Sequence, residues 1–70
     1  MILDRTEWVK RKALLSARVN FWNGDYFDPD EEVTVIGYKD DTVIILKQDG
    51  RVVHISHVSY NTIFIEGFYA

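Results

Sequence analysis

Apolar residues near the start of the chain recur at the spacing of an amphipathic helix. Trp8, Leu15 and Val19 occupy positions i, i+7 and i+11 of one stripe. Asp4 with Glu7 three residues later has the spacing of a capping box. Residues 5–17 contain neither Gly nor Pro. The pattern therefore predicts an N-terminal α-helix over about residues 5–17, which packs through Trp8 and Leu15 and turns its basic residues to solvent.

From Ala17 onward the apolar residues alternate with polar ones, which is the period of a half-buried strand. Asn23-Gly24 and Asp49-Gly50 favour tight hairpins because both residue types tolerate a positive φ. Asp40-Asp41 and Tyr60-Asn61 indicate two more turns, and Gly37 indicates a bend or bulge. The segments between these turns are five predicted strands: ARVNFW, EEVTVIGYK, TVIILKQ, RVVHISHVS and TIFIEGFYA.

A helix followed by five short antiparallel strands, with strands over about residues 17–67, predicts a mainly β protein. Tight turns and a short chain favour a small closed barrel of the SH3-like or Sm-like type. TVIILKQ is apolar on both faces, so we expect it to be a central strand. No linker or repeat divides the sequence, and residues 1–70 are expected to form one domain.

The composition limits how so short a chain can be stabilised. Seventy residues bury little surface, and the absence of Cys excludes disulfides and thiolate metal sites. Self-association is the remaining expectation. No apolar run reaches the length of about 18 residues that a membrane span needs, and the N-terminus lacks a basic leader with an apolar block. We therefore expect a cytoplasmic protein that does not enter a membrane.

The last two predicted strands form a long apolar edge. Such an edge on a monomer attracts other strands, because its backbone N–H and C=O groups lack partners. Pairing the edges of neighbouring protomers would close a homo-oligomeric ring, since the two joined edges are different surfaces. A monomer whose last residues fold back over the edge is the alternative. The predicted interface consists of Val53, Ile55, Ile63, Phe64, Ile65 and Phe68.

The charge of the chain is unevenly distributed. The formal net charge is −3, yet residues 1–20 hold five basic and two acidic residues, whereas residues 21–70 hold three basic and nine acidic ones. A basic first segment on an acidic body can attract phosphate or an acidic partner, or it can be a solvated helix face.

The stretch VNFWNGDYFDPDEE, residues 19–32, combines aromatic and acidic residues and allows three interpretations. A calcium loop is disfavoured because Val33 stands where the sharp turn needs Gly, and because Pro29 stiffens the loop. An aromatic and acidic surface over about residues 20–32 would suit a basic protein partner, as in peptide-binding SH3 domains. The third interpretation is a plain connection whose aromatic side chains fill the core.

Catalytic residues are not apparent. The chain has no Cys nucleophile, and His54 and His57 would point to opposite faces of one strand. The sequence therefore predicts a protein that is not an enzyme and that has neither a cofactor nor a metal site.

Three segments, RVNFWNG, VTVIGYKDDTVIILK and ISHVSYNTIFI, resemble the Sm-like family, particularly its bacterial Hfq-like branch. Asn23-Gly24 matches the turn after the first strand of the family. GYKDDTVIIL is similar to its strand-turn-strand segment with an Asp before an apolar run. His57 matches the His of a Lys-His pair, with Ser56 in place of the Lys. The resemblance implies a homo-oligomeric ring that binds single-stranded RNA.

The sequence also departs from the family at three places. Thr42 stands where members often have a base-stacking aromatic residue, Val43 or Ile44 replaces the base-reading Asn, and the Arg-Gly pair is absent. The resemblance and the basic first segment together give these candidate nucleic-acid-binding residues: Tyr38, Lys39, Asp41, Ser56, His57, Lys10, Arg11 and Arg18. Binding of single-stranded RNA or DNA is the first functional expectation, and an SH3-like protein-interaction module is the second.

Overall fold

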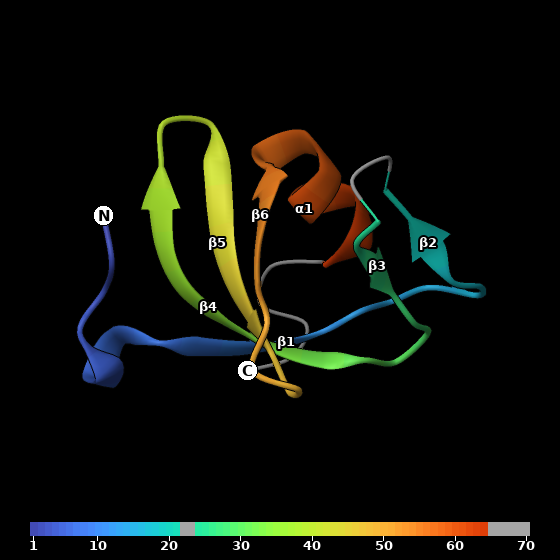
Figure 1. Ribbon diagram of the computed structural model, residues 1–70, viewed down its shortest axis with the longest axis horizontal. Coiled ribbons are helices and arrows are strands. Elements are labelled where there is room, and N and C mark those ends of the chain that lie inside the picture. Colours follow the sequence, from blue (N-terminus) through green and yellow to red (C-terminus); the bar gives the residue numbers. More distant parts are fainter. Residues whose placement is uncertain (22–23, 65–70) are drawn as a thin grey trace.

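The computed structural model describes residues 1–21 and 24–64, and it is mainly β (Figure 1). The elements are a 3-10 helix Arg5–Glu7, β1 Val9–Lys12, β2 Val19–Asn20, β3 Tyr26–Phe27, β4 Glu32–Lys39, β5 Thr42–Lys47, β6 Val52–Ser56 and α1 His57–Ile63. A four-stranded antiparallel sheet has the order β1-β4-β5-β6, and β2 and β3 form a separate two-stranded sheet. Within the described part of the chain, no helix has the length and apolar character needed to cross a bilayer.

The meander β4-β5-β6 agrees with the sequence prediction. Lys39 lies opposite Thr42, so Asp40-Asp41 forms the predicted turn, with Asp40 in the left-handed region at φ 53°. The Asp49-Gly50 turn is also confirmed, and the Gly50 N–H donates to the carbonyl oxygen of Lys47 at 3.1 Å. Strand β5 has a neighbour on each side, as its apolar sequence predicts.

Gly37 lies at the predicted irregularity of β4. The pairing with β5 shifts between Val35 and Gly37, and Ile2 forms a bridge with Gly37 from the other side. A Cβ atom at Gly37 would overlap the carbonyl oxygen of Met1. The absence of a side chain therefore allows the first residues of the chain to pair with the end of β4.

The predicted N-terminal helix is wrong. Its residues form a short 3-10 helix and then β1, in which Val9 lies opposite Val35 and Arg11 opposite Val33. The Asp4 side chain makes no capping hydrogen bond. The edge of β4 pairs with residues 9–12, and this tertiary pairing outweighs an intrinsic helical preference of a few tenths of a kcal/mol per residue.

The prediction of strands beyond Ser56 is also wrong where the structure describes them. The Ser56 side chain caps α1 by accepting a hydrogen bond from the Ser59 N–H at 3.1 Å. Tyr60, Ile63 and Phe64 are buried, which is the i, i+3, i+4 spacing of a helix. Residues 65–70 of the last predicted strand lie outside the described residues. The described residues thus form an open four-stranded sheet and not the predicted five-stranded barrel.

The first predicted hairpin exists but pairs differently from expectation. Val19 of β2 lies opposite Phe27 of β3, so this hairpin, which falls between β1 and β4 in the sequence, forms its own two-stranded sheet. Gly24 has a φ of 92°, and the Phe21 N–H donates to the carbonyl oxygen of Asp25 at 2.8 Å. Asn23 and Trp22 lie outside the described residues. Figure 1 shows the hairpin beside α1.

A series of aromatic contacts joins this hairpin to α1. The Phe27 ring lies edge-on to Phe64, with 5.5 Å between centroids, and edge-on to Phe21 at 5.8 Å. Phe64 in turn stacks with Tyr60 at 5.3 Å. Phe27 and Phe64 are both fully buried, so the core extends from the sheet beneath α1 to the hairpin.

Ion pairs attach residues 25–31, which include β3, to Lys47 of β5 and to Arg51 before β6. The Lys47 ammonium lies 3.1 Å from the Glu31 carboxylate and donates to the carbonyl oxygen of Tyr26. It also lies 4.3 Å from the centroid of the Tyr26 ring. Arg51 pairs with Asp25 at the tip of the hairpin. Because the Lys47 side chain is 4% exposed, solvent weakens this ion pair very little.

We expect the Lys47→Met variant to lower the free energy of unfolding by about 2–4 kcal/mol, because Glu31 would lose its partner in a largely buried position. The exposed Lys39 gives a matched control, and Lys39→Met should change stability by less than about 0.5 kcal/mol. Urea denaturation followed by circular dichroism measures both. Equal midpoints for the two variants would contradict the role assigned to Lys47.

Candidate functional site

Five of the predicted nucleic-acid-binding residues lie together where the β4–β5 turn meets the start of α1. The Tyr38 and His57 rings stack with 6.1 Å between centroids and an interplanar angle of 14°. The backbone N–H of His57 donates to the carbonyl oxygen of Asp41 at 2.7 Å, and this bond attaches the start of α1 to the turn. Lys39 and Ser56 lie opposite Thr42, from β4 and β6 respectively. His57 as a whole is exposed, and its ring also lies edge-on to Tyr60, with 6.5 Å between centroids.

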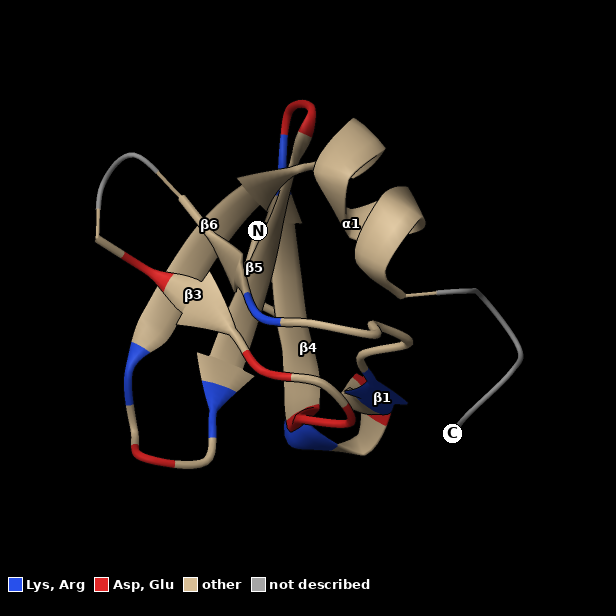
Figure 2. Ribbon diagram, turned by 90° about the vertical axis from the view of Figure 1, so that its right-hand side faces the viewer, with Lys and Arg blue, Asp and Glu red and all other residues tan. Residues whose placement is uncertain are grey.

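The charge at this end is mixed. Lys39 and the Met1 ammonium, which donates to the carbonyl oxygen of Tyr38, supply positive charge. Asp40 and Asp41 supply an equal negative charge, and Figure 2 shows their turn beside α1. This end therefore lacks the excess of bases that phosphate binding requires.

The other three predicted bases lie elsewhere, so the expected basic helix face does not exist. Alternation along β1 sends Lys10 and Arg11 to opposite faces of the sheet: Lys10 is exposed and Arg11 is buried. The Arg11 guanidinium donates to the carbonyl oxygen of Lys10 at 3.1 Å. Arg18 pairs with Asp28 at 2.6 Å, and this hydrogen-bonded carboxylate raises the pKa of Arg18 above its ordinary value.

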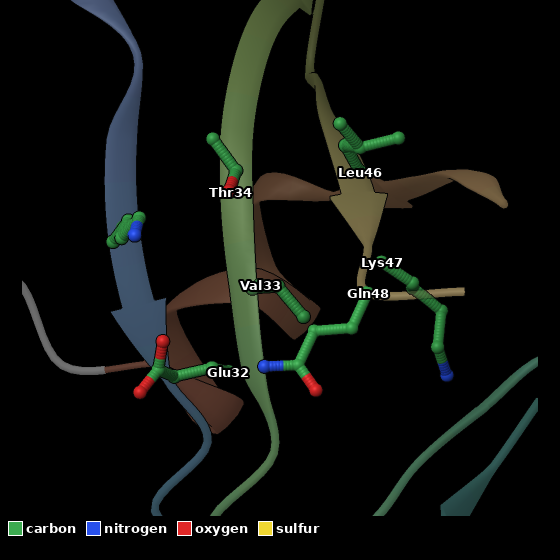
Figure 3. A pocket seen from close by; sticks show the side chains of 7 residues that line it. Glu32, Val33, Thr34, Leu46, Lys47 and Gln48 are labelled. Carbon is green, nitrogen blue, oxygen red and sulfur yellow. The ribbon is translucent and has the colours of Figure 1, made fainter. Parts of the chain in front are cut away.

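Lys10 borders a shallow hollow of about 260 Å³ on the face of the sheet away from the core. Figure 3 shows Thr34 and Leu46 on neighbouring strands at this hollow, with Glu32 and Gln48 at its lower side. The Lys47 side chain extends away from it toward β3, where its ammonium is bound. The hollow therefore presents opposite charges and is separate from the Tyr38 and His57 pair.

The predicted oligomer interface coincides largely with the core of the protomer. Val53, Ile55, Ile63 and Phe64 are between 0% and 5% exposed. Their side chains are thus used within one chain and are not available to a neighbour. Ile65 and Phe68 lie outside the described residues. On β6 the exposed apolar side chain is Val52, at 52%.

An apolar groove of about 180 Å³ lies between the hairpin and α1. Its described lining residues are Leu15, Val19, Phe21, Val58, Ser59, Thr62 and Ile63. None of these residues carries a charge. Val58 on α1 is 78% exposed, the most exposed of the large apolar side chains in the described part.

The local structure explains why Val58 points outward. The Ser56 cap starts the helix at His57, and burial of Tyr60 and Ile63 then leaves Val58 on the exposed side. The opposite wall is set by Phe21, whose ring rests against the buried Phe27. Because residues 51–59 were predicted to form a strand, the sequence did not indicate α1 or the groove beside it. The signal that identifies it is Ser56 at an N-cap before residues with helical spacing.

Three of the five acidic residues of the 19–32 stretch are paired with bases. Asp25 pairs with Arg51, Asp28 with Arg18, and Glu31 with Lys47. Phe27 fills the core, as the plain-connection interpretation expects. Among residues 1–21 and 24–64 no group of three or more His, Asp or Glu side chains is arranged to hold a metal ion.

Comparisons with known proteins do not assign the chain to a family. No family model, curated protein or solved structure matches it.

Proposed function

We propose that this protein is a small protein-interaction domain whose groove between the β2–β3 hairpin and α1 receives an apolar side chain of a partner. The observation that carries the proposal is the exposure of Val58, 78%, within an apolar groove. A single exposed apolar residue is ordinary, but a cluster of apolar residues that includes one, as in this groove, is typical of an interaction site.

The size of the groove favours a protein ligand. Its volume of about 180 Å³ is smaller than the roughly 300–1,000 Å³ typical of small-molecule pockets. It therefore suits one bulky side chain, which is how anchor residues enter pockets at protein interfaces. The SH3-like expectation from the sequence is consistent with this class of function, because SH3 domains bind peptides along aromatic-lined grooves.

Replacing Val58 tests the proposal. We expect peptides selected from a random displayed library on the wild-type domain to bind Val58→Lys at least about tenfold more weakly, because the charge would be desolvated in the groove. Val52→Lys is the matched control, since Val52 is also exposed but lies on β6 and does not line the groove. Equal binding of the selected peptides to wild type and Val58→Lys, or no selected binder at all, would refute the proposal.

Single-stranded nucleic acid binding at the Tyr38 and His57 pair is the second candidate. The observation in its favour is the exposed, stacked ring of His57. Stacking of a base on an aromatic side chain contributes about 1–3 kcal/mol. Because the charge at this end is mixed, binding would depend on stacking more than on phosphate contacts. Binding of single-stranded RNA is also the function that the resemblance to the Sm-like family implies.

For that candidate we expect His57→Ala to weaken binding of short fluorescent homopolymers of RNA about tenfold, through the lost stacking contact. Lys10→Gln should leave the affinity unchanged, since Lys10 lies on the outer face of β1. One phosphate contact from Lys39 would give a slope of only about −0.7 in log affinity against log salt. Absence of binding at micromolar protein in low salt would exclude this candidate.

Self-association remains a prediction, and of the two terminal strands of the main sheet we propose β6 for it. In the described part of the sheet β6 has β5 as its one neighbour, and it exposes Val52. We expect light scattering at tens of micromolar to give a multiple of the 8.2 kDa chain mass, and Val52→Lys to reduce it, because a charge on the edge opposes strand pairing. A wild-type mass near 8.2 kDa would show that the edge does not pair.

A further inference from the structure

We infer that the partner presents an uncharged apolar segment to the groove and not a basic one. This inference rests on the proposed function and specifies the ligand. It differs from the expectation drawn from the acidic 20–32 stretch, which pointed to a basic partner.

The walls of the groove offer no compensation for a charged ligand. Leu15, Val19 and Phe21 form one side, and α1 forms the other without any Lys, Arg, Asp or Glu (Figure 2). A charged side chain placed there would lose its hydration without gaining an ionic partner. An aliphatic or aromatic side chain loses nothing comparable and buries its own surface.

The two hydroxyl groups of the lining each make one hydrogen bond within or next to α1. The Thr62 hydroxyl donates to the carbonyl oxygen of Val58 at 2.9 Å. The Ser59 hydroxyl accepts a hydrogen bond from the Ser56 hydroxyl at 3.1 Å, which leaves its own O–H free to donate. The lining can therefore offer a ligand a neutral hydrogen bond but no ionic partner.

The neighbouring acids are committed to bases of the same chain. Asp25 is the first acidic residue after Phe21, which lines the groove, and its charge is neutralised by pairing with Arg51. Asp28 and Glu31 farther along are paired with Arg18 and Lys47. Paired charges produce a weak field at a distance, so they attract a basic segment poorly.

Salt dependence separates the two ligand classes. Affinities of the peptides selected on the wild-type domain are to be measured between about 0.01 M and about 1 M salt, over which the Debye length falls from about 30 Å to about 3 Å. We expect the selected sequences to share an apolar residue without neighbouring Lys or Arg, and their affinities to change less than about twofold over this range. Enrichment of Lys or Arg, with affinity falling as salt rises, would overturn the inference.

A charge placed in the groove gives an independent test. Thr62→Glu adds a carboxylate at an exposed position of α1, and selection on this variant should then enrich Lys and Arg. The same substitution at Asn61, which is exposed on α1 but is not among the lining residues, is the matched control and should leave the selected sequences apolar. If Thr62→Glu and Asn61→Glu select the same peptides, the groove does not determine ligand charge.

These outcomes distinguish the inference from the proposed function. Peptides that lose binding on Val58→Lys but are rich in Lys or Arg would support the proposed function and refute the inference. Selected peptides indifferent to Val58→Lys would refute both. A wild-type oligomer that Val58→Lys dissociates, and Val52→Lys does not, would identify a second copy of this chain as the occupant and would refute the inference of a separate partner.

Discussion

The edge-on contact between Phe27 and Phe64 is the interaction on which the arrangement of this protein depends. Phe27 comes from the short hairpin and Phe64 from the end of α1, and the two fully buried rings bring together parts of the chain 37 positions apart. The main sheet supplies the surface beneath them and also holds the hairpin through Lys47 of β5, which donates to the carbonyl oxygen of Tyr26. The pair of rings, with the Phe21 ring edge-on to Phe27, joins the hairpin to the helix at the base of the groove.

Ion pairs also hold residues 25–31, which include β3, against the main sheet. Lys47 lies almost completely out of solvent, where an ammonium is stable only with a carboxylate, a carbonyl oxygen and aromatic faces around it, and Glu31, Tyr26 and Phe27 provide them. Three of the acids in residues 19–32, Asp25, Asp28 and Glu31, thus form ion pairs within the protein. The groove between the hairpin and α1 is lined by uncharged residues, although the chain as a whole has a net charge of −3.

The sequence predicts the features that short-range chemistry determines. The Asp40-Asp41 and Asp49-Gly50 turns and the central position of β5 depend on residues close together in the chain, and the pattern identifies them correctly. The first segment could not be predicted in this way, because residues 9–13 satisfy a helical stripe and a strand alternation equally well, and only the free edge of β4 decides between them. The groove was missed for a related reason. Ile63 and Phe64 suit a strand by type, whereas the Ser56 cap and the burial of Tyr60 make the segment helical.

The insertion of the hairpin between β1 and β4 in the sequence also bears on the order of folding. The meander β4-β5-β6 is closed by turns of a few residues, so its contacts are local and form quickly. The hairpin and the segment before it, residues 14–27, contact partners far along the chain. The Leu14 backbone N–H donates to the carbonyl oxygen of Ile63 at 3.0 Å, and the Phe27 ring packs against Phe64. Closing such long loops costs entropy before any contact is gained. We therefore expect the hairpin to dock after the meander has formed, so that the groove between the hairpin and α1 exists only in molecules whose folding is complete.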